Sequence, residues 1–221
     1  MPTIALVRHA TTAATGHRLG GWTPGVHLDD AGRDQARETA RHLAVHPVAA
    51  VYTSPLERTL ETATIIGEAV DRAPQVERGL GETDYGEWTN RPLEELRDEP
   101  LWAVIQATPS RATFPGGESL RASQARMVET LETIARAHDT DGLVVAVGHA
   151  DPIKAALAHY LGMPLDTFQR IAISPASVSV LSLSQARPPA VMGMNLLQDL
   201  PIPVPTADAG PPSMTPSDPS A

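Results

Sequence analysis

The sequence predicts an α/β fold, with three α/β/α layers and a mostly parallel central sheet. Two observations lead to this prediction. Short, continuously apolar runs, typical of strands covered on both faces, occur at residues 3–7 and 143–147. Strand-like and helix-like segments then alternate along the chain, which favours parallel strands joined by helices on both faces of the sheet.

The length of 221 residues is enough for one sizeable core, and no internal repeat is visible. We expect a single domain over residues 1–200. Proline and small polar residues dominate beyond that point, so residues 201–221 are expected to form a disordered tail.

Two strand–helix pairs, separated by a long glycine-rich loop, are expected in the first 80 residues. The loop covers residues 8–28, and a loop of this length inside a compact domain is usually functional. The other elements are a strand at 3–7, a helix from Asp29 or Asp30 to about Ala44, a strand at Val48–Thr53, a helix with Ser54 as N-cap and Pro55 in its first position through Ala69, and a strand near Val76–Leu80.

The rest of the chain begins with a segment of turn-forming residues at 79–92. Helices and strands alternate again after it. They are two short helical pieces at 92–99 and 101–107, a long helix at 118–138, a strand at 143–147, a helix with Pro152 in its first turn, a strand marked by Val178, Val180 and Leu183, and a candidate strand at Ala190–Asn195.

Composition and charge exclude several classes of protein. A net charge of −9 and a pI near 5.3 argue against a nucleic-acid partner, which requires a basic face. The chain has no cysteine, so neither disulfides nor a thiolate metal site are available. No apolar run approaches the roughly 18 residues of a membrane span, so we expect a cytoplasmic protein with no membrane partner. The sequence leaves a monomer and a homodimer open.

Polar and mostly cationic side chains follow the predicted strands. The carboxyl ends of parallel strands meet at one edge of a sheet, where ligands of α/β proteins bind. Two arginines and two histidines meeting there in an acidic protein would repel one another unless an anion lay among them. The pattern therefore predicts a phosphate site. The residues concerned are Arg8, His9, Arg58, Glu82 and His149.

These residue types suit phosphoryl transfer. Arginine donates two parallel hydrogen bonds to phosphate oxygens, and Arg58 lies in the expected first turn of its helix, where free backbone N–H groups add positive potential. An imidazole is a competent nucleophile at neutral pH, and nearby arginines keep it unprotonated, which fits His9. Glu82 is placed as the general acid. Neither a metal ion nor an organic cofactor is expected.

Five short motifs that carry these residues follow one another along the chain. They read VRHATT, SPLERTLETA, GETDYGEW, PGGES with Arg126 seven residues on, and VGHAD. Together they resemble the histidine phosphatase superfamily, also called the phosphoglycerate mutase-like family, over roughly residues 3–185. The resemblance implies the phosphoglycerate mutase-like fold and phosphoryl transfer through a phosphohistidine.

The resemblance also implies a role for each candidate residue. His9 would be the nucleophile, and Glu82 the acid for the leaving oxygen and then the base for water. Arg8, Arg58 and His149 would hold the equatorial oxygens of the transferred phosphoryl group. The expected substrate is a small phosphomonoester.

Two positions depart from the family's pattern. The family motif usually reads Arg-His-Gly and continues to an Asn that helps to bind phosphate, whereas this chain has Ala10 and, by register, Thr15. A methyl group at position 10 is tolerated if φ is negative there. Thr15 offers a hydroxyl group as the candidate phosphate ligand.

The segment after Tyr85-Gly86 favours a phosphatase over a mutase. The mutase branch carries there a longer segment ending in Leu-Asn-Lys that grips the acid substrate, whereas Glu87-Trp88 of this chain is closer to the Gly-x-Trp of the phosphatase branch. A 2,3-bisphosphoglycerate-dependent phosphoglycerate mutase stays the alternative enzyme. A member that binds phosphorylated ligands without turnover is the alternative of another class.

The other histidines have simpler interpretations. His42 and His46 are spaced i, i+4 and could share a metal ion, as could His149 and Asp151, but no further ligand set surrounds either pair. No metal site is therefore expected. Apart from His9 and His149, the histidines are interpreted as surface groups, His42 and His46 included, and His17 is the one that could enter the pocket from the first loop.

Overall fold

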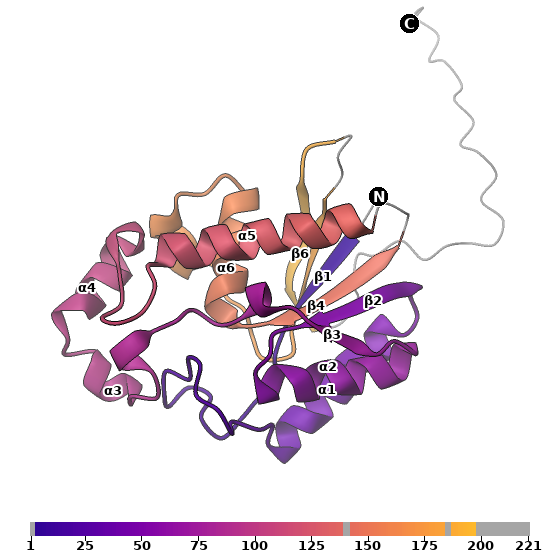
Figure 1. Cartoon of the computed structure of the whole chain (residues 1–221), viewed down its shortest axis with the longest axis horizontal. Coiled ribbons are helices and arrows are strands. Elements are labelled where there is room, and N and C mark those ends of the chain that lie inside the picture. The colour runs from indigo at the N-terminus through magenta and orange to yellow at the C-terminus, as the bar shows by residue number, and fades with distance from the viewer. Residues whose placement is uncertain (1–2, 139–141, 184–186, 198–221) are drawn as a thin grey trace, which may run out of the picture.

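A six-stranded sheet forms the centre of the molecule (Figure 1). The computed structural model describes residues 3–138, 142–183 and 187–197. The strands are β1 (Thr3–Arg8), β2 (Val48–Thr53), β3 (Pro74–Val76), β4 (Leu143–Gly148), β5 (Val178–Ser182) and β6 (Ala190–Leu196). They lie in the order β3-β2-β4-β1-β5-β6. Strands β3, β2, β4 and β1 are parallel, and β5 and β6 add antiparallel neighbours, so the mostly parallel sheet is confirmed.

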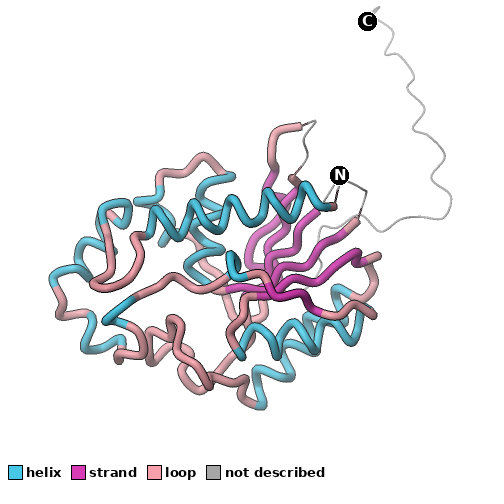
Figure 2. Tube along the Cα trace, viewed as in Figure 1, coloured by secondary structure: helices cyan, strands magenta, loops and turns pink. Residues whose placement is uncertain are grey.

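Helices cover both faces of the sheet, which confirms the three-layer arrangement (Figures 1 and 2). One face carries α1 (Asp30–Leu43) and α2 (Glu57–Val70), and the other carries α5 (Leu120–Ala137) and α6 (Ala150–Tyr160). Two short helices, α3 (Leu93–Leu96) and α4 (Pro100–Ala107), lie beyond the carboxyl ends of the parallel strands (Figure 1). Short 3-10 helices occur at Arg78–Leu80, Gly86–Trp88, Pro109–Arg111 and Leu165–Arg170.

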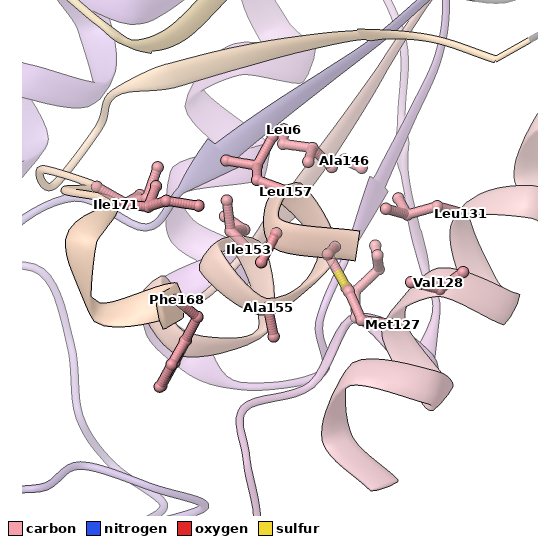
Figure 3. Close-up of a cluster of buried hydrophobic side chains, with 14 of the residues drawn as sticks. Leu6, Met127, Val128, Leu131, Ala146, Ile153, Ala155, Leu157, Phe168 and Ile171 are labelled. Carbon is pink, nitrogen blue, oxygen red and sulfur yellow. The ribbon is translucent and has the colours of Figure 1, made fainter. Parts of the chain in front are cut away.

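Alternate residues of the central strand β1 point to opposite faces of the sheet. Ile4 and Leu6 are fully buried in the layer formed with α5 and α6, and Ala5 and Val7 are buried in the layer formed with α1 and α2. Figure 3 shows Leu6 beside Leu157 in the first of these layers. Burial of a side chain such as Leu6 contributes about 1.5–3 kcal/mol. Because both faces are covered, every position of this strand core is apolar.

Side-chain caps set the start of two helices. Asp29 Oδ1 accepts a hydrogen bond from the Gly32 N–H at 2.6 Å, and Ser119 Oγ accepts one from the Ala122 N–H at 3.1 Å. Each bond satisfies a backbone donor that the first turn leaves unpaired, and such a cap is worth about 1 kcal/mol. The helices expected from Asp29 or Asp30 and over 118–138 are confirmed, with ends that differ by one or two residues.

The predicted start of α2 is wrong. The helix begins at Glu57, and its N-cap, Leu56, lies two residues after the expected cap. Ser54 does not cap it because its hydroxyl is used elsewhere: Oγ lies 2.8 Å from Nε2 of His149. A residue with good capping chemistry therefore belongs to the site at the strand ends.

The strand expected at Val76–Leu80 is also wrong, since β3 ends at Val76. Glu77 Oε1 accepts a hydrogen bond from the Gly79 N–H at 2.9 Å, which turns the chain into a 3-10 helix. The helical piece expected at 92–99 is shorter than predicted and covers only Leu93–Leu96. These corrections leave the order of the elements unchanged.

The register of the sheet brings two strand ends to the same level. Arg8, the last residue of β1, lies beside Gly148, the last residue of β4. The next residues, His9 and His149, therefore leave the sheet side by side, with their ring centroids 5.3 Å apart. The fold thus unites two motifs separated by most of the chain.

Two expectations concern segments beyond this core. Within the described ranges, no helix combines the length and apolar character that a membrane crossing requires. The predicted tail at 201–221 lies outside the described residues, so the domain division at residue 200 stays a prediction.

Candidate active site

A cavity of about 240 Å³ lies at the carboxyl ends of the parallel strands. The first loop and the segment before α3 meet beside it, since the Leu93 N–H donates to the His17 carbonyl oxygen at 3.0 Å. Of the six predicted site residues, His149 is not among those that line the cavity, but it contacts one of them, Arg58. The other five line the cavity: Arg8, His9, Thr15, Arg58 and Glu82.

His9 follows β1 and is 7% exposed. Its Nδ1 lies 2.8 Å from the carbonyl oxygen of Ala10, and because a carbonyl only accepts, Nδ1 carries the proton. Nε2 therefore keeps a lone pair, and it has no hydrogen-bond partner in the part of the chain that the structure describes. Burial, followed by the positive charges of Arg58 and Arg8, lowers the pKa of His9 to about 3. The ring is neutral at pH 7 and is chemically able to act as a nucleophile.

His149 follows β4 and is completely buried beside His9. Its Nδ1 lies 3.3 Å from Nη2 of Arg58, and its Nε2 lies 2.8 Å from Oγ of Ser54. A guanidinium only donates, so Nδ1 accepts and Nε2 donates to Ser54. Burial, followed by the charge of Arg58, lowers the pKa of His149 well below its usual value. Both histidines are thus neutral at pH 7.

Arg8 and Arg58 bring two positive charges to the cavity. Arg58 lies in the first turn of α2, is 3% exposed and donates from Nη2 to the Gly21 carbonyl oxygen at 2.7 Å. Arg8 donates from Nη1 to the Ile173 carbonyl oxygen at 2.7 Å. Among the described residues, Nε of Arg8 and Nη1 of Arg58 are buried without a hydrogen-bond partner. Desolvated guanidinium groups with unused donors suit an anion with several oxygens, as phosphate is.

Glu82 reaches the same place from the loop that follows β3. Its Oε1 accepts a hydrogen bond from the Thr83 N–H at 2.9 Å, and its Oε2 lies 3.8 Å from Nδ1 of His149. Burial, followed by the negative charge of Asp151, raises the pKa of Glu82 to about 7, and the charge of Arg58 opposes this rise. A carboxyl group with this pKa can give or take a proton near neutral pH.

Side chains from distant elements hold the loop that carries Glu82. Trp22 Nε1 donates to the carbonyl oxygen of Glu82 at 2.7 Å. Arg126 of α5 donates to the carbonyl oxygens of Gly79 and Gly81 at 2.7 and 2.9 Å. It also reaches the Glu82 carbonyl oxygen at 3.2 Å. A Cβ at Gly81 would lie only 2.4 Å from the Trp22 ring, so this approach requires glycine.

The two departures from the family's pattern have a local explanation. Ala10 is buried with a negative φ, and its N–H donates to Oγ1 of Thr62 at 3.1 Å, so the methyl group is accommodated. Thr15 lines the cavity, where its Oγ1 accepts a hydrogen bond from the Thr12 N–H at 3.0 Å. The Thr15 hydroxyl therefore orders the first loop.

Several lining residues are not apparent from the sequence. Tyr85 donates its hydroxyl to Oδ2 of Asp151 at 2.9 Å, and both residues line the cavity. One sequence feature could have pointed to Asp151 as a site residue, namely its position in the VGHAD motif. The apolar wall formed by Leu19, Val26 and Leu93 has no such feature, because these residues come from two segments without a recognisable period.

The histidines outside the site are placed as follows. His17 is exposed and is not among the residues that line the cavity. His42 Nε2 lies 2.9 Å from Glu38 Oε1. His46, in the turn between α1 and β2, is buried, which corrects its interpretation as a surface group. The described ranges contain no group of three or more His, Asp or Glu side chains arranged to hold a metal ion.

Comparison with known proteins agrees with the geometry. The sequence matches the histidine phosphatase superfamily (branch 1) over residues 4–195. It is 31% identical over 192 residues to phosphoserine phosphatase 1 of Hydrogenobacter thermophilus, a match that covers 85% of this chain and 89% of that protein. It is 26% identical to the 2,3-bisphosphoglycerate-dependent phosphoglycerate mutase of Thermoplasma acidophilum, over 72% of this chain and 76% of that protein.

The fold matches the solved structure of Bacillus stearothermophilus YhfR with a TM-score of 0.82 at 25% identity, covering 88% of this chain and 97% of that one. The phosphoglycerate mutase-like fold is therefore confirmed. One of the two sequence relatives is a phosphatase and the other a mutase, and both kinds of enzyme transfer phosphoryl groups. This chain belongs to the histidine phosphatase superfamily.

Proposed function

We propose that the protein is a metal-independent phosphatase that hydrolyses a small phosphomonoester through a phosphohistidine on His9. One observation carries the proposal. A neutral imidazole with a lone pair on Nε2, two buried guanidinium groups with unused donors and a carboxyl group of pKa about 7 meet at one cavity. Each of these groups has a defined task in phosphoryl transfer, which depends mostly on positioning and on charge stabilisation.

In the first step, Nε2 of His9 attacks phosphorus, and the bond between phosphorus and the ester oxygen breaks. Glu82 gives its proton to the leaving oxygen, so that a neutral alcohol departs. Arg8 and Arg58 donate to the equatorial oxygens, where negative charge gathers. His149, held by Ser54, accepts from Nη2 of Arg58 and keeps that guanidinium in place.

In the second step, a water molecule attacks the phosphohistidine. Glu82, now a carboxylate, takes a proton from this water, and the bond between phosphorus and Nε2 breaks. Inorganic phosphate is released, and His9 returns to its neutral form.

The charges of the cavity favour hydrolysis over mutase activity. A phosphoglycerate mutase must hold the carboxylate of its substrate as well as the phosphate. The cations lining the cavity are Arg8, Arg58 and Arg18, and the first two belong to the proposed phosphate pocket. Arg18 is exposed, and its Nη1 donates to the carbonyl oxygen of Asn90. The similarity to a phosphoserine phosphatase also supports a hydrolase.

Hydrolysis of p-nitrophenyl phosphate in excess EDTA tests the proposal, with released phosphate as the readout. We expect turnover in EDTA and a loss of about 10³-fold or more in His9→Ala. His159→Ala is the matched control, because it removes an exposed histidine from the far end of α6. Loss of wild-type activity in EDTA would contradict the metal-free scheme, and full activity of His9→Ala would exclude His9 as the nucleophile.

The intermediate can be detected directly. A brief reaction with a radiolabelled ester should leave label on the wild-type protein that survives base and is lost in acid, as expected of a phosphohistidine. His9→Ala should carry no such label. Label that resists acid and is lost in base would point to another nucleophile.

Two alternatives have their own outcomes. Conversion of 3-phosphoglycerate to 2-phosphoglycerate that depends on 2,3-bisphosphoglycerate and outpaces phosphate release would identify a mutase. Binding of sugar phosphates, nucleotides or other phosphate esters by the wild-type protein without any turnover would identify a phospho-ligand binding protein.

A further inference from the structure

The cavity contains a negative charge whose one part in the proposed phosphoryl transfer is to help raise the pKa of Glu82. Asp151 lies in the first turn of α6, two residues after His149, and lines the cavity together with Arg8 and Glu82. A carboxylate is an unfavourable neighbour for a phosphate dianion, because like charges repel. We therefore expect the Asp151 carboxylate to contact the alcohol part of the substrate rather than its phosphate.

Asp151 is held in one orientation. Its Oδ2 accepts the hydroxyl proton of Tyr85 at 2.9 Å, and its Oδ1 lies 3.3 Å from Nζ of Lys154. Tyr85 is buried and packs edge-on against Phe114, with ring centroids 4.9 Å apart, so its hydroxyl cannot easily turn away. Burial, followed by the charge of Asp151, raises the pKa of Tyr85 well above its usual value, and the hydroxyl stays a donor. Each carboxylate oxygen keeps a second lone pair for a ligand.

The surroundings of Asp151 offer little to a second negative charge. Arg8 and Arg58 are committed to the phosphoryl oxygens in the proposed function. Lys154 pairs with Asp151 and is not among the residues that line the cavity. Arg18 lines the cavity, but its side chain is exposed and its Nη1 donates to the carbonyl oxygen of Asn90. A substrate carboxylate close to the ester would therefore be repelled by the carboxylate of Asp151. An ammonium or hydroxyl group at the same place could instead donate a hydrogen bond to that carboxylate.

We propose that Asp151 selects the leaving group, so that the protein favours phosphomonoesters whose alcohol carries an ammonium or hydroxyl group near the ester and disfavours those with a carboxylate there. Asp151 is then a specificity-determining residue, and Tyr85 is the residue that positions it. This proposal rests on the proposed function, since it concerns the alcohol released in the same reaction. The apolar wall of Leu19, Val26 and Leu93 suits the carbon skeleton of a small alcohol.

Three esters of nearly equal size test the proposal. They are 2-aminoethyl phosphate, 2-hydroxyethyl phosphate and phosphoglycolate, which carry an ammonium, a hydroxyl and a carboxylate group on the same two-carbon frame. For the wild-type protein we expect kcat/KM to fall in that order, by about 100-fold between the first and the last. Asp151→Asn keeps the shape and removes the charge, so it should lower this ratio about tenfold. Any effect of Asp151 on Glu82 as an acid is absent from binding measurements in the His9→Ala background, because no proton is transferred to a leaving group there.

Asp71→Asn is the matched control. It makes the same change of charge at an exposed residue that follows α2, where φ is 53° and Asn is tolerated as well as Asp. The ratio should be unchanged in this variant. The proposal is wrong if the wild-type protein shows no preference among the three esters, or if Asp151→Asn retains the wild-type preference.

Binding measurements separate a failure of this proposal from a failure of the proposed function. In the His9→Ala background, titration calorimetry gives the dissociation constants of the three esters without turnover. The role of Asp151 would be supported if the affinities follow the order expected for kcat/KM and if Asp151→Asn makes the differences between them smaller. This would hold even if the wild-type protein hydrolysed none of the esters. Equal affinities with and without Asp151→Asn would overturn that role, whereas phosphate release by the wild-type protein would still support the proposed function.

Discussion

His9 and His149 extend two neighbouring parallel strands, whereas Glu82, across the same cavity, sits on a loop held by the side chains of Trp22 and Arg126. Backbone hydrogen bonds of the sheet place the first pair, with ring centroids 5.3 Å apart. Side-chain hydrogen bonds from other elements place the carboxyl group. The sheet itself therefore places the proposed nucleophile and the histidine beside it, while the proposed acid depends on the packing around it.

Burial also acts in opposite directions on the two sides of the cavity. It lowers the pKa of His9 to about 3 and raises that of Glu82 to about 7, because in each case it disfavours the charged form. Near pH 7 this leaves an unprotonated nucleophile and a carboxyl group that is about half protonated. One physical effect thus prepares two groups for opposite roles.

The largest expected effect comes from the histidine side. His9→Ala should lower kcat/KM by about 10³-fold or more for alkyl phosphates and for p-nitrophenyl phosphate alike, because the attacking group is lost whatever leaves. Steady-state kinetics with both esters measures this. A loss confined to alkyl phosphates would instead assign His9 to the leaving group.

The phosphate pocket should give the next largest effect. Arg58→Met should lower kcat/KM by about 10²–10³-fold, because it removes donors from the developing charge. It should also abolish stabilisation by inorganic phosphate, which for the wild-type protein is about 2.7 kcal/mol at 100 times Kd. Differential scanning calorimetry with and without phosphate checks this. Arg37→Met, on the exposed surface of α1, is the control and should keep both properties.

On the acid side, the effect should depend on the leaving group. Glu82→Gln should lower kcat/KM by about 10–10²-fold for an alkyl phosphate and by less than about threefold for p-nitrophenyl phosphate, which needs no proton to leave. With the alkyl ester, wild-type kcat/KM should fall as pH rises above about 7, where Glu82 loses its proton. The Glu82→Gln variant should not show this fall in kcat/KM at high pH. Equal losses of kcat/KM with both esters would argue against the role of Glu82 as an acid.

The same carboxyl group should alter stability with pH. Its pKa is raised from 4.5 to about 7, so the folded protein holds this proton more tightly than the unfolded chain. The resulting stabilisation is fully present below pH 4.5 and is lost as pH rises through about 7, by an amount on the order of 3 kcal/mol. Urea unfolding across this range should show the free energy of Glu82→Gln rising relative to wild type. A constant difference between the two proteins would contradict the burial argument.

The smallest expected effect comes from the residue that holds the acid's loop. Arg126→Met should lower kcat/KM about tenfold for alkyl phosphates and less for p-nitrophenyl phosphate. It should also cost about 1–3 kcal/mol of stability, because loop carbonyl groups lose their donor. Arg136→Met, at the exposed end of α5, is the control. A loss of stability without any dependence on the leaving group would show that the loop and the acid are not coupled.

The strand ends could be predicted because they depend on local pattern. A strand covered on both faces is apolar throughout, and its end is the first place where a polar side chain can leave the core. The runs at 3–7 and 143–147 show this before Arg8-His9 and His149. Ligands of α/β sheets bind at that edge, so the place of the site followed from the strands.

Periodicity and near neighbours in the chain are enough to predict the layers, the order of the elements and the cationic residues at the strand ends. They do not predict which partner each side chain meets in the folded protein. Ser54 has the chemistry of a helix cap, yet its hydroxyl is bonded to His149, 95 residues along the chain. The same holds for the bond between Tyr85 and Asp151, whose partners are 66 residues apart. Propensity and periodicity depend only on neighbours in the sequence, whereas these contacts exist only once the sheet and its helices have assembled.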